Sequence, residues 1–168
     1  MAVTDFLPAE HGSFPTRSIL GIPFFAGDLD CAIASAIRGG LILAPSGPGL
    51  AVDLCRDQAY ATALHSADLI LPDSGLMSLW WNFLYGKKEG RINRISGLLF
   101  LKNFISTQLG SLMQDSFWIM PNRSQDTANR QWLASAHGLS VSDDHVYVAP
   151  IYEDSGPIED SLLLELLA

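Results

Sequence analysis

The sequence has few basic residues and few cysteines. Lys and Arg together number 10 against 18 Asp and Glu, which gives a net charge of −8. Binding to a nucleic-acid backbone requires clustered Lys and Arg that neutralise phosphates, so we expect no nucleic-acid partner. Cys31 and Cys55 are the only cysteines, and their spacing is not that of metal ligands. We expect two buried, reduced thiols in a cytoplasmic protein.

Long apolar runs and targeting signals are also missing. The longest apolar stretch, SGLMSLWWNFLYG (residues 74–86), is shorter than the roughly 18–20 residues that span a bilayer. The opening MAVTDFLPAEHGSF has acids and a proline where a signal peptide has a basic flank and an apolar run. The histidines form no H-x-x-x-H or H-E-x-x-H motif, and G-x-S-x-G is absent. We therefore expect neither a zinc site nor a serine nucleophile elbow.

The residues that are present predict a well-packed α/β protein. Hydrophobic residues make up 48% of the 168 positions and charged residues 17%, which argues against disorder and for one domain with a sizeable core. Short, uniformly apolar segments alternate with amphipathic ones, which predicts a mostly parallel sheet with helices on both faces. We expect a leader at residues 1–18 and a single domain at 19–168.

The boundaries of the elements follow from local signals. Asp28 is a candidate N-cap for a helix that Gly39-Gly40 ends. The last helical pattern, residues 158–168, has no strand after it, so we expect a longer protein or completion by a second chain. Extended segments are expected at 18–27, 41–44, 68–72, 115–121 and 145–152, and the remaining helices at 50–67, 74–85, 97–112 and 124–137.

The loop PSGPG, residues 45–49, is the first candidate for ligand binding. It follows the apolar LILA and opens a helix, and ligands of open α/β sheets bind beyond the carboxyl ends of strands. Ser46, Gly47 and Gly49 would let backbone amides approach a phosphate, helped by the helix dipole. The alternative is a turn whose prolines and glycines only shape the chain, because the spacing is neither the Walker pattern nor G-x-G-x-x-G.

Asp73, which directly follows the apolar segment DLILP (residues 68–72), is the second candidate for a functional residue. A carboxylate at the carboxyl end of a strand could act as the general base for a hydroxyl group. The alternative is an N-cap for the next helix, a role that Ser74 could take instead. Ser74 and Gly75 lie at the same junction and are candidates for contacts with substrate.

KKEGRINRIS, residues 87–96, is the only basic cluster in the chain. It suits a diphosphate or an anionic membrane surface, with Arg91 and Arg94 as candidates for phosphate contacts; the alternative is a solvated loop. The preceding helix is dense in aromatic residues. We expect these to lie in the core, although aromatics beside basic residues also fit a patch that contacts a membrane interface.

Two motifs in this order resemble a known family. ADLILPD (residues 67–73) and RISG (94–97), together with the elements around them, are similar to the WecG/TagA/CpsF family of bacterial glycosyltransferases over roughly residues 19–152. That family includes the N-acetylmannosaminyltransferases of teichoic-acid and common-antigen assembly. Its Thr-x-Asn-Pro loop falls on Pro45-Ser46-Gly47-Pro48, without the Thr and Asn, and one of its acids falls near Leu99.

The resemblance implies a Rossmann-like fold and an inverting transfer that needs neither metal nor cofactor. The sugar would move from a UDP-sugar donor to a polyprenyl-diphosphate-linked saccharide acceptor in cell-surface polysaccharide synthesis. Asp73 would be the catalytic base, and Arg94 would lie at the substrate site. Such an enzyme would act at the inner face of the cell membrane as a peripheral protein, alone or as a homo-oligomer. The second interpretation is a non-catalytic nucleotide-sugar-binding or scaffold domain of the same fold.

Overall fold

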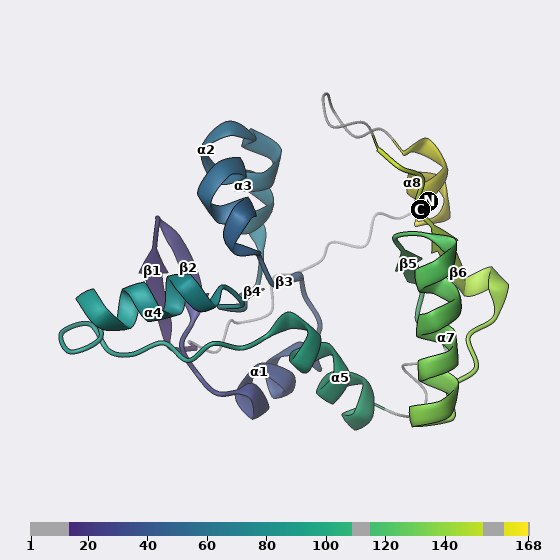
Figure 1. Cartoon of the computed structure of the whole chain (residues 1–168), viewed down its shortest axis with the longest axis horizontal. Coiled ribbons are helices and arrows are strands. Elements are labelled where there is room, and N and C mark those ends of the chain that lie inside the picture. Colours follow the sequence, from purple (N-terminus) through teal and green to yellow (C-terminus); the bar gives the residue numbers. More distant parts are fainter. Residues whose placement is uncertain (1–13, 109–114, 153–159, 168) are drawn as a thin grey trace, which may run out of the picture. The chain divides into compact units, whose positions relative to one another are not determined.

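The computed structural model describes residues 14–108, 115–152 and 160–167. The chain divides into two compact units, residues 1–104 and 105–168 (Figure 1). Helices alternate with short strands, and two of the three described strand pairs are parallel. The predicted α/β class is therefore confirmed. The single domain and the Rossmann-like sheet stay predictions.

The first unit begins with a hairpin. β1 (Thr16–Ile19) pairs antiparallel with β2 (Ile22–Phe25). Leu20 and Gly21 connect them with φ angles of 54° and 80°, as a two-residue hairpin turn requires. The expected extended segment is confirmed, but the leader was predicted to reach residue 18 and that boundary is wrong. Thr16 and Ser18 are exposed, so this strand lacks the apolar pattern by which the others were recognised.

A parallel pair follows the first helix. β3 (Ile42–Leu43) pairs with β4 (Leu69–Ile70). The Asp68 carboxylate accepts a hydrogen bond of 2.8 Å from the Leu41 backbone N–H, which ties the start of one strand to the other. A Cβ atom at Gly40, where φ is +114°, would lie 2.7 Å from Asp68 Oδ2. Both the backbone conformation and the close carboxylate therefore favour glycine at this position.

β4 is buried on both of its faces. Ile70 belongs to a cluster with Leu64 and Trp81, whereas Leu69 and Leu71 belong to a second cluster with Ile33. Successive side chains of a strand point to opposite faces, so two separate apolar clusters flank this one strand. Helices thus supply core residues to both faces, which explains why the segment is uniformly apolar.

α1 (Leu29–Ala36) covers one of those faces. Asp28 caps it as predicted, because its carboxylate accepts a hydrogen bond of 2.8 Å from the Cys31 backbone N–H. The expectation of buried thiols is wrong, since Cys31 and Cys55 are both free and exposed. The buried stripe of α1 is made by Ala32, Ile33 and Ala36. Cys31 is not part of this stripe, so its thiol is exposed.

The segment 50–67, expected as one helix, is divided. A π-helical turn, Gly49–Asp53, leads into α2 (Leu54–Arg56), and α3 (Gln58–Ser66) follows. Asp57 separates the two helices with extended dihedral angles, and its carboxylate accepts from the backbone N–H groups of Ala59 and Tyr60. Aspartate competes with the helix for backbone donors and favours caps, which accounts for the break.

α4 (Gly75–Leu84) lies within the first unit, and the sequence of α5 (Gly97–Thr107) runs across the boundary between the units after residue 104. The expectation that the aromatic residues of α4 form core holds for Trp81, which is buried and donates to the Gly90 carbonyl oxygen over 3.0 Å. It is wrong for Phe83, which is 87% exposed. Residues 109–112 of the helix expected at 97–112 lie outside the described residues.

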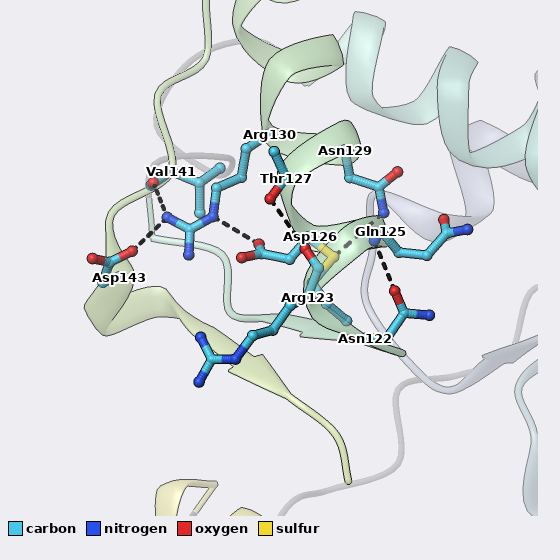
Figure 2. A network of polar contacts seen from close by, with 10 residues as sticks. Asn122, Arg123, Gln125, Asp126, Thr127, Asn129, Arg130, Val141 and Asp143 are labelled. Carbon is cyan, nitrogen blue, oxygen red and sulfur yellow. Dashed lines mark hydrogen bonds and ion pairs between the residues drawn. The ribbon is translucent and has the colours of Figure 1, made fainter. Parts of the chain in front are cut away.

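The second unit contains another parallel pair. β5 (Trp118–Met120) pairs with β6 (Val146–Val148), and α7 (Arg123–His137) connects them. Asn122 caps α7 through a 2.8 Å bond from the Gln125 backbone N–H (Figure 2). Gly138 ends the helix in the left-handed conformation, with φ +65°, as the sequence predicts.

Arg130 links α7 to the chain that leads into β6 (Figure 2). Its Nε donates to Asp126 Oδ1 over 2.7 Å, and its Nη1 contacts the Val141 carbonyl oxygen at 3.0 Å and Asp143 Oδ1 at 2.8 Å. Asp143 opens a short 3-10 turn, Asp143–His145. One guanidinium thus holds the helix and the turn before the strand together, which assigns this polar network a structural role.

The last helix, α8 (Ser161–Leu166), is joined to β6 by one carboxylate. Asp160 accepts hydrogen bonds from the Tyr147 and Tyr152 hydroxyls and from the Leu163 backbone N–H. The hydrogen bond to Asp160 raises the pKa of Tyr147 to about 12. The bond from Tyr152 lowers the pKa of Asp160, and the Leu163 N–H lowers it further.

None of the described helices is long and apolar enough to cross a lipid bilayer.

Asp160→Asn should return the pKa of Tyr147 from about 12 toward 10.0, because the charged acceptor is lost. The folded pKa of Tyr147 exceeds its ordinary value, so its hydrogen bond stabilises the fold below pH 10.0 and loses that effect as the pH rises through about 12. Ultraviolet absorbance of the phenolates against pH measures this. Asp144→Asn, which changes an exposed acid of the same unit, is the control. Equal titration curves for Asp160→Asn and the unmutated chain would contradict the assignment.

Candidate functional site

The junction between β4 and α4 places Asp73 at the carboxyl end of a strand. Its backbone N–H donates to the Leu71 carbonyl oxygen over 2.9 Å. The Ser74 hydroxyl caps α4 by accepting from the Met77 backbone N–H at 3.3 Å. The helix cap is therefore provided by Ser74, which leaves the Asp73 carboxylate available for other contacts.

Arg94 makes the principal contact with Asp73. Its Nε donates to the Asp73 carbonyl oxygen over 2.7 Å, and its Nη2 donates to Oδ1 over 3.2 Å. The Arg94 side chain is 55% exposed and that of Asp73 27%, so water screens the pair and its contribution to stability is small. The guanidinium is thus positioned at the carboxylate without being locked there.

The chain that carries Arg94 is held against α4 and β4. The Asn82 side-chain amide exchanges two hydrogen bonds with the Ile92 backbone, of 2.8 and 2.9 Å. The Ile95 backbone N–H donates to the Pro72 carbonyl oxygen over 3.2 Å. Ile92 and Ile95 are both buried. Arg94 lies between these two anchored residues and therefore next to the end of the strand.

The PSGPG loop lies beside the same junction. A Cβ atom added at Gly47 would be 3.1 Å from the Ser74 hydroxyl oxygen, and one at Gly49 would be 2.7 Å from the Tyr60 hydroxyl oxygen. Within the loop, Ser46 Oγ accepts from the Gly49 backbone N–H at 3.4 Å. The close approach of Gly47 to Ser74 brings both sequence-predicted segments to one place.

The start of α5 closes the arrangement. A Cβ atom at Gly97 would lie 3.4 Å from Asp73 Oδ2 and 2.8 Å from the Ala44 Cβ at the end of β3. The two carboxylate oxygens of Asp73 therefore face different groups, Arg94 on one side and the first residue of α5 on the other. Gly97 and Ala44 are not among the site residues predicted from sequence. A glycine directly after Arg-Ile-Ser and before a helix is the signal that could have identified Gly97.

Four of the predicted substrate-binding residues, Gly47, Ser74, Gly75 and Arg94, thus lie at the junction with Asp73. Gly75, the first residue of α4, also lies close to Arg94, because a Cβ atom there would be 3.6 Å from Arg94 Cδ. Arg91 differs: it is exposed, and no hydrogen bond or ion pair links it to another described residue. The residues grouped there are Gly47, Asp73, Ser74, Gly75 and Arg94. Ser46 and Gly49 belong to the same loop as Gly47 but bond to each other, and a Cβ atom at Gly49 would meet Tyr60.

The electrostatics of this place combine one carboxylate with several positive groups. The guanidinium of Arg94 and the N-terminal ends of α4 and α5, each of which carries a partial positive charge, surround Asp73. Such surroundings attract anionic groups, phosphates included. No group of three His, Cys, Asp or Glu side chains among residues 14–108, 115–152 and 160–167 could hold a metal ion. A carboxylate in such surroundings can accept a proton next to a bound anion.

Comparisons with models of protein families and with curated proteins give no match to this chain.

Gly97→Ala should destabilise the first unit by about 1–3 kcal/mol, because the new methyl group overlaps Ala44. Urea denaturation followed by circular dichroism measures the change. Gly75→Ala is a matched control, since it alters the first residue of the neighbouring helix and meets only an ordinary contact at 3.6 Å. We expect the control to unfold at the same urea concentration as the unmutated chain or a higher one. Equal stability of the two variants would mean that the Ala44 side chain leaves room for a methyl group at position 97, and would contradict the prediction.

Proposed function

We propose that this chain is a glycosyltransferase domain with a Rossmann-like arrangement of its strands. It moves a sugar from a UDP-sugar to a hydroxyl group of a polyprenyl-diphosphate-linked saccharide at the inner face of the cell membrane. The observation that carries the proposal is the grouping of Arg94 and the PSGPG loop around Asp73 at the carboxyl end of β4. Open α/β sheets bind their ligands at such edges.

The proposed reaction is a single displacement with inversion. Asp73 accepts the proton of the acceptor hydroxyl, and the hydroxyl oxygen forms a bond to the anomeric carbon of the donor sugar. The bond between that carbon and the diphosphate oxygen breaks, and UDP leaves with the electron pair. Arg94 and the N-terminal ends of α4 and α5 stabilise the negative charge that develops on the diphosphate.

Arg94 has to change partner during this sequence. In the structure its Nη2 donates to Asp73 Oδ1 over 3.2 Å, so this carboxylate oxygen already has a hydrogen-bond donor and is not open to an acceptor hydroxyl. More than half of the Arg94 side chain is exposed, so the guanidinium can turn to a bound diphosphate. Arrival of the donor would then release Asp73 for the acceptor hydroxyl.

The same contact also supports the second candidate, a nucleotide-sugar-binding or scaffold domain without catalysis. In this alternative the pair of Asp73 and Arg94 persists in the ligand-bound state. Pro45 and Gly47 offer no polar side chain at the positions where the resembling family has Thr and Asn. Binding of UDP without turnover by the unmutated chain, measured by calorimetry and by a transfer assay, would favour this candidate.

Asp73→Asn should lower transfer by about 10²–10⁴-fold, the usual contribution of a general base. The assay follows a radiolabelled sugar from each of a panel of UDP-sugars to a polyprenyl-diphosphate-linked acceptor. UDP affinity should not fall, because loss of the Asp73 charge frees Arg94 for the diphosphate. The circular dichroism spectrum should change little, because water screens the ion pair that is lost. Asp30→Asn, which changes an exposed acid of α1, is the control. Near-normal turnover by folded Asp73→Asn would refute the role given to Asp73.

A further inference from the structure

One face of α4 exposes an apolar stripe. Leu76, Leu79, Trp80 and Phe83 are 80%, 71%, 47% and 87% exposed. These positions follow the spacing i, i+3, i+4 and i+7, so they share one side of the helix. Trp81, on a different side, is buried in the core of the first unit. Both sides of the helix are therefore apolar. The side with Trp81 packs into the core, whereas the side with the stripe is not buried by any other described part of the chain.

The basic cluster follows this helix directly. The chain leaves α4 into a loop at the end of the helix far from β4 (Figure 1). Lys87, Lys88 and Arg91 are all exposed there. Glu89 is the only acid between residues 85 and 96, and it lies 3.8 Å from Lys88 Nζ. A local excess of positive charge thus borders the apolar stripe, in a chain whose net charge is −8.

We propose that this face of α4 and the loop after it bind the surface of an anionic lipid bilayer. The apolar stripe enters the boundary between headgroups and acyl chains, and the lysines contact lipid phosphates, as in helices that lie in the membrane interface. Trp80 suits this boundary, because its ring is apolar and its N–H is polar.

The size of the stripe favours a bilayer over a second copy of the chain. A helix of ten residues is about 15 Å long, and it offers four stripe residues. A stable dimer interface takes about 20–30 residues from each partner. A bilayer sets no such minimum, since burial of a few apolar side chains combines with the attraction of nearby basic residues.

The position of the stripe bears on the proposed reaction. α4 begins two residues after Asp73, so its exposed Leu76 lies close to the candidate site in sequence and along the helix. A bilayer bound to this face would bring a lipid-linked acceptor to that end of the helix. This use of the surface rests on the proposed function, whereas the binding itself does not.

The test is sedimentation of the full chain with lipid vesicles that contain no saccharide and no polyprenyl diphosphate. One set is phosphatidylcholine alone, and the other also contains phosphatidylglycerol. We expect binding to increase with phosphatidylglycerol content. Binding should weaken as salt rises from about 0.1 M to about 1 M, because the screening length falls from about 10 Å to about 3 Å.

Two double variants separate the contribution of the apolar stripe to membrane binding from that of the basic loop. Leu79→Ser with Phe83→Ser removes the centre of the stripe, and Lys87→Glu with Lys88→Glu reverses the loop charge. The lysine variant should bind anionic vesicles at least tenfold more weakly, from a loss of about fivefold for each basic residue. Exposed residues elsewhere supply the controls, which should bind normally: Ile151→Ser for the apolar change, and Arg56→Glu with Arg123→Glu for the charge reversal.

Circular dichroism checks that each variant is folded. We expect every variant to keep the spectrum of the unmutated chain, because the substituted positions are exposed. Absence of binding at every phosphatidylglycerol content would overturn the proposal, as would equal binding to neutral vesicles. Equal loss in the control variants would also overturn it. A dimer in size-exclusion chromatography that Leu79→Ser with Phe83→Ser converts to a monomer would assign the face to a second copy instead. None of these outcomes depends on sugar transfer, so a failure here is distinct from a failure of the proposed function.

Discussion

Burial of β4 on both faces is the constraint on which the candidate site depends. Ile70 and its neighbours Leu69 and Leu71 point into two separate apolar clusters, so the strand cannot shift by one residue without exchanging its faces. Pro72 then directs the chain out of the sheet, and Asp73 falls at the strand end. The position of one carboxylate is therefore fixed by apolar packing on either side of the strand before it.

The other half of the site is held by a different kind of interaction. The segment with Arg94 has no regular secondary structure, and side-chain amide bonds from Asn82 replace the hydrogen bonds of a strand. Buried Ile92 and Ile95 anchor it to the core. A rigid carboxylate thus faces a guanidinium on an irregular segment. This difference suits a site in which Asp73 stays in place while Arg94 changes its partner.

Local signals predicted much of this arrangement. Apolar runs indicated β3 and β4, and short-range caps such as Asp28 and Ser74 were identified correctly because their partners lie within three residues. Predictions failed where the structure depends on contacts between residues far apart in the sequence, or on a side chain that competes with a helix for backbone hydrogen bonds. Asp57 divides an apparently continuous helix by capping a new one. The contact of Gly97 with Ala44 joins residues 53 positions apart, which no local pattern reveals. The partner of Arg94, 21 positions away, is likewise set by the fold.

The exposure of both cysteines makes the first unit suited to selective chemical labelling. The Asp28 carboxylate, through its hydrogen bond and its charge, raises the pKa of the Cys31 thiol. Since the thiolate is the reactive form, this carboxylate slows the reaction of the Cys31 thiol with an electrophile at neutral pH. A fluorophore attached to the exposed Cys55, in α2, would lie only a few residues along the chain from the PSGPG loop. Such a probe would report ligand arrival without any change to the sequence.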